Sequence, residues 1–231
     1  MIISGLQKTT LIDYPGRVAA TVFLSGCNFR CPFCYSSELV LPERIKDQPV
    51  LSEKYFFDFL RDKVGLLEGI VVCGGEPTLN LDLPDFLKKI KDMGFLVKLD
   101  TNGSNPRMLE SLIEQKLVDY VAMDVKAPKE KYLDVVKGKI DVNDIERSIN
   151  ILKEGKVDYE FRTTIVPGIH SKEDIIKIAS WLKPAKRYFL QNFRADKTID
   201  PSFEGVKPYL DSFLLEIKGE IASGFEDCQI R

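Results

Sequence analysis

The sequence predicts an α/β fold, an open, TIM-like partial barrel of about six parallel βα units with an N-terminal lead-in strand or hairpin. Short apolar segments alternate with longer amphipathic ones, and this order requires parallel strands joined by right-handed crossovers. Eight such units normally need about 250 residues, so six units in a chain of 231 residues leave the barrel incomplete. A flat doubly wound sheet is the alternative, because periodicity alone cannot distinguish the two.

Six short apolar segments carry the predicted strands. They span residues 18–25, 69–73, 95–100, 118–124, 158–166 and 187–191. Residues 2–12 are β-rich but interrupted by polar residues, so we expect a lead-in strand outside the main sheet.

Segments with apolar residues every three or four positions carry the predicted helices. They span 52–64, 82–93, 106–116, one or two helices within 128–154, 171–182 and about 206–218. In the first helix the predicted inner face is Phe56, Phe57, Leu60 and Val64. The stretch 38–50 contains two prolines and is expected to be irregular or to form one short helix, and the tail after 218 is a candidate terminal strand.

The chain is expected to be one domain over residues 1–231, because no linker, repeat or low-complexity segment interrupts it. Within it we distinguish the lead-in (1–16), the barrel core (17–200) and a C-terminal helix and tail (201–231).

Composition excludes several classes of function. The formal charge is −2 with acids and bases nearly balanced, so no basic field favours nucleic acid. No apolar stretch reaches the roughly 18 residues that span a bilayer, and the first residues lack the pattern of a signal peptide. Five cysteines, three of them in one loop, argue against a disulfide framework. We therefore expect a cytoplasmic protein without membrane or nucleic-acid partners.

Three cysteines lie at C-x3-C-x2-C spacing directly after the first predicted strand, at Cys27, Cys31 and Cys34. Thiolates at such spacing favour zinc or an iron–sulfur cluster. A structural zinc site is closed by four ligands, whereas three ligands leave one metal corner open for a substrate. The zinc alternative therefore needs a distant fourth ligand, for which Cys73 is nearer than the single histidine, His170.

Other polar motifs also follow predicted strands. Gly74-Gly75-Glu76-Pro77 follows the second strand, and Asp100 and Asp124 end the third and fourth. The carboxyl ends of parallel strands form one edge in α/β folds, where active sites lie. The sequence therefore predicts an enzyme whose site combines the cysteine loop with these residues.

These motifs together resemble the radical S-adenosylmethionine (SAM) enzymes. The cysteine spacing with an aromatic residue before Cys34 is similar to that superfamily's signature, and the Gly-Gly-Glu-Pro run to its second motif. Asp100-Thr101-Asn102-Gly103 and Asp124-Val125-Lys126 resemble the glycyl-radical-enzyme activases. The opening Asp13-Tyr14-Pro15-Gly16 resembles the activating proteins of anaerobic ribonucleoside-triphosphate reductase, which are related to pyruvate formate-lyase activating enzymes.

The resemblance implies an oxidoreductase in which the three cysteines hold a [4Fe-4S] cluster and an electron from it cleaves SAM to a 5′-deoxyadenosyl radical. Phe33 would lie beside the adenine, Glu76 would accept from the SAM ammonium, and Lys126 would meet the methionine carboxylate or remain a solvated lysine. The residues expected to bind SAM are Phe33, Gly74, Gly75, Glu76, Asp100, Asn102, Asp124, Lys126 and Arg162. The resemblance also implies a monovalent cation site built from Asp100, Thr101, the carbonyl of Met123 and Asp124.

The implied partners are a glycyl-radical enzyme as protein substrate and a low-potential electron donor such as flavodoxin or ferredoxin. The pyruvate formate-lyase branch has a histidine after the sixth strand, but residues 190–194 contain none, which favours the reductase branch. The alternatives are a formate-lyase-type activase, a radical SAM enzyme acting on a small molecule or peptide, and a zinc-stabilised binding module. His170 follows a loop signal and is expected to be exposed, and Cys73 to be a small buried residue.

Overall fold

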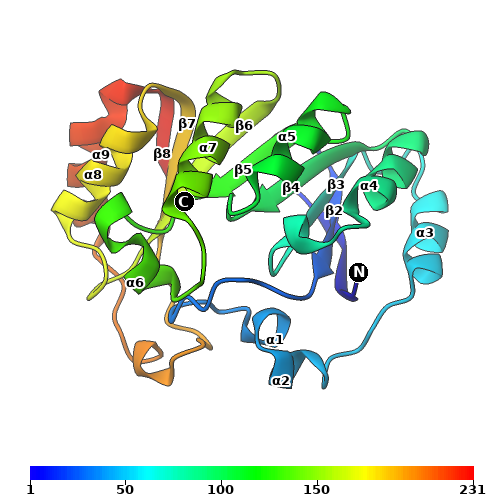
Figure 1. Ribbon diagram of the computed structural model, residues 1–231, viewed down its shortest axis with the longest axis horizontal. Coiled ribbons are helices and arrows are strands. Elements are labelled where there is room, and N and C mark those ends of the chain that lie inside the picture. The colour runs from blue at the N-terminus through cyan, green and yellow to red at the C-terminus, as the bar shows by residue number, and fades with distance from the viewer.

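The computed structural model describes residues 1–231. Its sheet has eight strands, β1 to β8, which lie side by side in chain order. β1 pairs with β2 antiparallel, and every later pair is parallel. β8 does not pair with β1, so the sheet curves into an arc that stays open, with the helices on its outer side (Figure 1). The predicted open α/β barrel is confirmed.

The strands are β1 (Ile3–Thr10), β2 (Ala19–Leu24), β3 (Gly69–Gly74), β4 (Leu96–Thr101), β5 (Tyr120–Asp124), β6 (Asp158–Ile165), β7 (Ala185–Asn192) and β8 (Phe225–Ile230). The helices are α1 (Ser37–Val40), α2 (Pro42–Ile45), α3 (Glu53–Arg61), α4 (Leu83–Asp92), α5 (Pro106–Glu114), α6 (Tyr132–Val136), α7 (Val142–Lys153), α8 (Lys172–Leu182) and α9 (Asp211–Ile221). All six predicted strands are present as β2 to β7.

Three local expectations differ from the structure, and a fourth, the candidate terminal strand, is confirmed. The lead-in strand β1 belongs to the main sheet as its antiparallel edge. The candidate terminal strand forms as β8 and pairs with β7, which adds a further parallel strand. Val64 is exposed because α3 ends at Arg61. The last helix starts at Asp211 rather than near 206, since residues 206–210 have no regular structure.

The two faces of the sheet have different chemistry because side chains alternate along each strand. In β3, Ile70 and Val72 join the large hydrophobic core beneath the helices. Val71 on the opposite face packs inside the arc with Tyr14, Ala19 and Tyr120. Farther along the strands, this inner face becomes charged.

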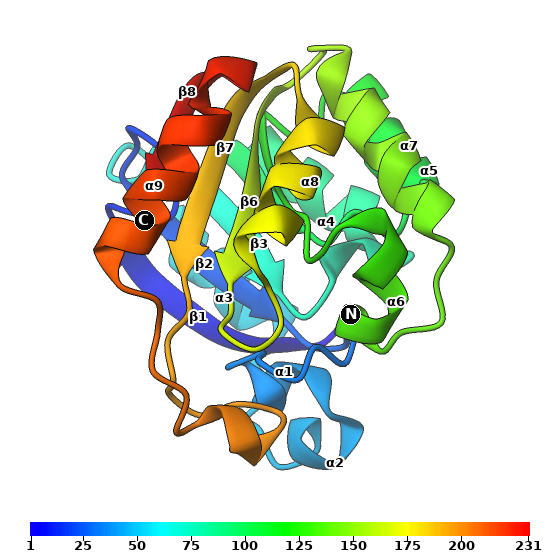
Figure 2. The same cartoon turned by 90° about the vertical axis from the view of Figure 1, so that its left-hand side faces the viewer.

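Two small helices and a long connection gather at one end of the sheet. Figure 2 shows α1, α2 and the segment between β7 and α9 at the end to which the arrows of β6 and β7 point, the carboxyl end of the parallel strands. The cysteine loop that joins β2 to α1 lies at this end as well. None of the helices is long and apolar enough to cross a membrane.

Candidate active site

The cysteine loop is fastened by hydrogen bonds from distant parts of the chain. The guanidinium of Arg30 donates from Nη1 to the carbonyl oxygens of Cys27 and Phe29, each at 2.7 Å. The Arg30 backbone N–H donates to the Val136 carbonyl at 2.7 Å. The segment after β7 adds two bonds, from Ile199 N–H to the Cys34 carbonyl at 3.0 Å and from Asp200 N–H to the Pro32 carbonyl at 2.9 Å. The loop is therefore held at a defined place without a disulfide between its cysteines.

All five cysteines are free thiols, and in the loop Cys31 is buried while Cys27 and Cys34 are half-buried. Burial raises the pKa of Cys27 to about 11 and that of Cys31 to about 12, and it also raises the pKa of Cys34. Because metals bind thiolates, loading a metal here must release protons. Three soft donors from one loop fit an iron–sulfur cluster.

The structure does not supply the closed set of ligands that a structural zinc requires. No group of three or more His, Cys, Asp or Glu side chains is arranged to hold a single metal ion. Cys73, the predicted fourth ligand of that alternative, packs within the arc against the cluster of Tyr14, Val71 and Tyr120. The zinc module is therefore not supported by the geometry.

Gly74, the last residue of β3, and Gly75 after it must be glycines, because the backbone at the end of β2 and the start of the cysteine loop lies directly against them. A Cβ on Gly74 would lie 2.2 Å from the Leu24 carbonyl oxygen, and one on Gly75 would lie 2.0 Å from that of Gly26. Gly75 N–H donates to the Leu24 carbonyl at 2.8 Å, and Glu76 N–H donates to the Gly26 carbonyl at 2.7 Å. The two glycines therefore let this backbone approach closely, and their approach to a ligand stays a prediction.

Replacing Gly75 with alanine should displace the cysteine loop, because the new Cβ cannot avoid the Gly26 carbonyl. We expect a loss of about 3 kcal/mol in the free energy of unfolding, as for other overpacked sites, together with lower iron uptake on reconstitution. Denaturant titration and iron analysis measure the two effects. The matched control is Gly205→Ala, where no atom lies within 4 Å of the added carbon. Equal stability of the two variants would contradict the steric role.

Glu76 is turned inward, and its carboxylate is already occupied. It is 1% exposed and accepts bonds at Oε1 from Thr78 N–H (3.1 Å), the Thr78 hydroxyl (2.5 Å) and the Thr101 hydroxyl (2.7 Å). Oε2 accepts from Asn102 N–H at 2.6 Å. Burial raises the pKa of Glu76 even though these bonds act in the opposite direction. Instead of presenting a free carboxylate to a ligand, as expected, Glu76 joins the ends of β3 and β4.

Asn102 links the end of β4 to the cysteine loop. Its Nδ2 donates to Asn28 Oδ1 at 3.0 Å and approaches Cys27 Sγ at 3.9 Å. Asn28 in turn donates from Nδ2 to the Ser104 hydroxyl at 2.8 Å, and Ser104 N–H donates to Asn102 Oδ1 at 2.9 Å. Among the predicted SAM-binding residues, Asn102 therefore contacts the cysteine loop directly.

The predicted carboxylates Asp100 and Asp124 lie side by side on β4 and β5, joined by Arg162 of β6. Arg162 donates from Nη1 to Asp100 Oδ2 at 2.9 Å and from Nε to Asp124 Oδ1 at 2.8 Å. Lys126 donates to Asp124 Oδ2 at 3.1 Å, and Lys98 donates to Asp100 Oδ1. Each carboxylate oxygen thus has a cationic partner.

These contacts outweigh the effect of burial on the charged groups. Burial alone would raise the pKa of Asp124, but Arg162 and Lys126 hold it well below its usual range. Burial alone would lower the pKa of Lys126, but Asp124 and the neighbouring thiols raise it. Arg162, Asp124 and Lys126 are therefore all charged at neutral pH, with three cations facing two carboxylates when Lys98 is included.

The residues present do not fit the predicted monovalent cation site. The carboxylates of Asp100 and Asp124 are paired with side-chain cations, as described above. The Thr101 hydroxyl donates to Glu76 at 2.7 Å and accepts from Gly103 N–H at 3.1 Å. An added cation would have to enter a cluster that already carries an excess of positive charge.

His170 is buried, contrary to the expectation of an exposed loop residue, and it holds the backbone at Lys126. It is 2% exposed. Nδ1 accepts from Val166 N–H at 3.0 Å, so the neutral ring carries its proton on Nε2, which donates to the Lys126 carbonyl at 2.8 Å. The ring also meets the edge of Phe33 at 6.3 Å between centroids. Phe33 is itself buried in the core, so His170 positions two predicted SAM-binding residues.

Acid should destabilise the protein partly through His170. Burial lowers the pKa of His170 below its ordinary value of about 6.5. The stability contributed by the neutral ring is therefore complete above that value and is lost as the pH falls towards the folded pKa. We expect the urea midpoint to fall more for wild type than for His170→Gln between about pH 7.5 and about pH 5.5. Parallel pH profiles of the two proteins would contradict this prediction, because they would show that folding does not change the pKa of the ring.

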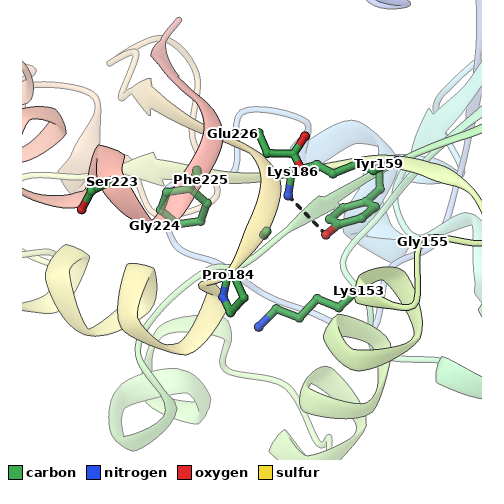
Figure 3. A pocket seen from close by; sticks show the side chains of 10 residues that line it. Lys153, Gly155, Tyr159, Pro184, Lys186, Ser223, Gly224, Phe225 and Glu226 are labelled. Atoms are coloured by element: carbon green, nitrogen blue, oxygen red, sulfur yellow. Dashed lines mark hydrogen bonds between the residues drawn. The ribbon is translucent and has the colours of Figure 1, made fainter.

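A separate surface cavity lies at the opposite end of the sheet. It has a volume of about 460 Å³ and is lined by residues such as Lys153, Tyr159, Lys186 and Phe225, near the starts of β6, β7 and β8 (Figure 3). The Tyr159 hydroxyl accepts from Lys186 N–H at 3.3 Å, and the Lys153 ammonium donates to the carbonyls of Trp181 and Lys183. None of the predicted site residues lies in this cavity.

Comparison with known proteins agrees with this arrangement. Residues 21–182 match the Radical SAM superfamily. MJ1227 of Methanocaldococcus jannaschii is named as a glycyl-radical enzyme activating enzyme. It is 36% identical to this chain over an alignment of 233 residues, gaps included, which covers 98% of this chain and 93% of that protein. MJ1632 of the same organism carries the same name and is 30% identical over 189 residues, covering 78% of this chain and 64% of that protein.

The fold also occurs in the structure of SuiB from Streptococcus suis bound to the precursor peptide SuiA. The TM-score is 0.67 at 13% identity, and the match covers 90% of this chain and 48% of SuiB. This likeness concerns the fold alone, and the chain spans only about half of that structure. The superfamily match and the near full-length similarity to MJ1227 go further: the chain belongs to the radical SAM enzymes, in the group that contains glycyl-radical enzyme activating enzymes.

Proposed function

We propose that this protein activates an anaerobic ribonucleoside-triphosphate reductase by generating a radical on one of its glycines. The observation that carries the proposal is the position of the three-cysteine loop. It lies at the carboxyl end of an open sheet, and the end of β4 reaches it through Asn102. A cluster held by three cysteines leaves one iron for the amino and carboxylate groups of SAM.

Cys27, Cys31 and Cys34 would hold the [4Fe-4S] cluster. When bound, the cluster supplies the electron that breaks a carbon–sulfur bond of SAM and gives the 5′-deoxyadenosyl radical. Lys126 and Arg162 would receive the methionine carboxylate, because their group has one positive charge more than its two aspartates neutralise. Phe33 would pack beside the adenine, positioned by His170. The bonds from Ile199 and Asp200 keep the loop covered on one side and limit access of water.

The open side of the barrel supports a protein substrate. β1 and β8 do not pair, so a loop of a partner enzyme can approach the site between the two edges. The names of MJ1227 and MJ1632 point to a glycyl-radical enzyme as that partner. The reductase is favoured over formate-lyase by the opening Asp13-Tyr14-Pro15-Gly16 motif and by the absence of histidine from residues 190–194.

The radical chemistry also requires an electron donor, and we propose flavodoxin or ferredoxin for this role. Five free cysteines and an iron–sulfur cluster would need a reducing setting, which favours the cytoplasm. Each of the two donors is tested separately with the reconstituted protein.

The test is anaerobic reconstitution with iron and sulfide followed by reduction in the presence of SAM. We expect 5′-deoxyadenosine and methionine as products and, with the reductase present, the electron paramagnetic resonance doublet of a glycyl radical on the reductase. Absence of SAM cleavage would refute radical SAM chemistry. A doublet on formate-lyase only, or a modified small molecule or peptide without a doublet, would instead assign the protein to one of the alternative substrate classes.

A further inference from the structure

A lysine is buried inside the half-barrel, two residues before Asp100. Lys98 lies on β4 between Val71 of β3 and Tyr120 of β5, and its side chain is only 1% exposed. Its ammonium pairs with Asp100 Oδ1. A buried ammonium is costly unless a carboxylate neutralises it. Strand alternation places Leu96, Lys98 and Asp100 on the same inner face, so the pair is built into the strand.

This ammonium completes the set of cations around the two aspartates. Arg162 bridges Asp100 and Asp124 at 2.9 and 2.8 Å, and Lys126 takes the remaining oxygen of Asp124 at 3.1 Å. Without Lys98, Oδ1 of Asp100 would be a partly buried carboxylate oxygen with no cationic partner. In the absence of Lys98, this oxygen would therefore need a cation from solution to neutralise it.

A third carboxylate, that of Glu160, lies within ion-pair distance of Arg162 and does not change this balance. Glu160 is fully buried and lies 4.0 Å from Arg162 Nη1. It is neutralised by Arg231, which donates from Nη1 at 3.0 Å and from Nη2 at 3.2 Å, and the Tyr120 hydroxyl donates to it at 2.8 Å. Glu160 is therefore satisfied by its own partners and does not attract a further cation to Asp100.

We infer that the Lys98 ammonium is a covalently attached substitute for a monovalent cation, so that this protein binds SAM without Na⁺ or K⁺. The inference rests on the proposed function, because it concerns the pocket assigned to SAM. An ammonium held on a strand is present at every salt concentration, whereas a free ion must be recruited from solution. The Lys98 ammonium also holds Asp100 in place. The two aspartates can then orient Arg162 and Lys126, the cations proposed to bind the SAM carboxylate.

The first experiment measures SAM binding to the reconstituted, unreduced protein in NaCl, KCl and choline chloride at equal ionic strength. Wild type should bind SAM with equal affinity in the three salts. Lys98→Met keeps the apolar stem but removes the charge, so its affinity in choline chloride should fall by about tenfold and return on addition of K⁺ or Na⁺, as for two coupled sites. An affinity of wild type that depends on the alkali cation would overturn the inference.

The second experiment does not depend on SAM or the cluster. The melting temperature of Lys98→Met should rise when K⁺ or Na⁺ replaces choline, whereas that of wild type should not. The matched control is Lys91→Met, which removes another lysine from an ion pair, with Asp119 at 2.7 Å, away from the site. It should gain no response to alkali cations. A Lys98→Met protein that folds without gaining this response would also overturn the inference.

The outcomes separate this inference from the proposed function. Failure to bind SAM in any of the salts would refute the proposed function itself. Binding of SAM by wild type only in NaCl or KCl would leave radical SAM chemistry intact and would refute the role of Lys98. Should Lys98→Met not fold, the salt series on wild type still decides the question.

Discussion

Replacing Cys31 with serine should abolish SAM cleavage by the reconstituted protein. Cys31 is the most buried of the three loop thiols, and a hydroxyl is a poor ligand for iron. Since the cofactor carries the chemistry, loss of the cluster removes the whole rate enhancement, which we expect to exceed about 10⁶-fold. Iron and sulfide analysis, the visible absorbance of the cluster and 5′-deoxyadenosine release measure the effect. Cys27→Ser and Cys34→Ser should behave in the same way.

The matched control is Cys73→Ser. Cys73 packs inside the arc, so this variant should take up as much iron as wild type, about four per chain for a [4Fe-4S] cluster. Equal loss of metal in Cys73→Ser and Cys31→Ser would mean that Cys73 is a fourth ligand. Stoichiometric zinc in place of iron after anaerobic purification would support the binding module instead.

Replacing Arg162 with methionine should cause the largest loss of stability of any single charge change in the site. The substitution removes the bridge between Asp100 and Asp124 and leaves two adjacent, largely buried carboxylates facing each other. Breaking a buried pair from one side costs about 3–5 kcal/mol. We expect about 3 kcal/mol here, at the lower end of that range, because the two aspartates keep 19% and 25% exposure and retain their lysine partners. Urea titration of the metal-free protein measures this value.

Two further variants separate the role of Arg162 from a general loss of charge. Arg162→Lys keeps the positive charge but cannot bridge both aspartates with a planar fork, so it should recover only part of the stability. Arg17→Met removes an exposed arginine paired with Glu68 at 2.7 Å and should leave the urea midpoint near that of wild type. An Arg162→Met protein as stable as Arg17→Met would show that the bridge contributes nothing to folding.

Periodicity predicted the parallel sheet well because its signal is local. The alternation of apolar runs and amphipathic segments placed all six strands β2 to β7, and the motifs that follow four of them meet at one end of the sheet. The edge position of β1 could not be predicted in the same way, since it depends on pairing with β2 across a turn. The start of α9 was misplaced because residues 206–210 are partly apolar but have no regular structure.

Side-chain partners were harder to predict than side-chain positions. Glu76 was correctly placed at the end of a strand, but its partners Thr101 and Asn102 come from the next strand, so its inward orientation was not evident. His170 follows a loop signal, yet its partner is the Lys126 carbonyl, 44 residues away in the sequence. Lys98 was missed although it carries the same signal as Arg162, a charged residue within an apolar strand.

The linear strand order has a consequence for how the chain folds. Each strand pairs with the one before it, so the sheet can grow by one βα unit at a time during synthesis. The cysteine loop is an exception, because it follows β2 but is fastened by Val136, Ile199 and Asp200. The loop that receives the metal is therefore among the last parts of the molecule to become rigid.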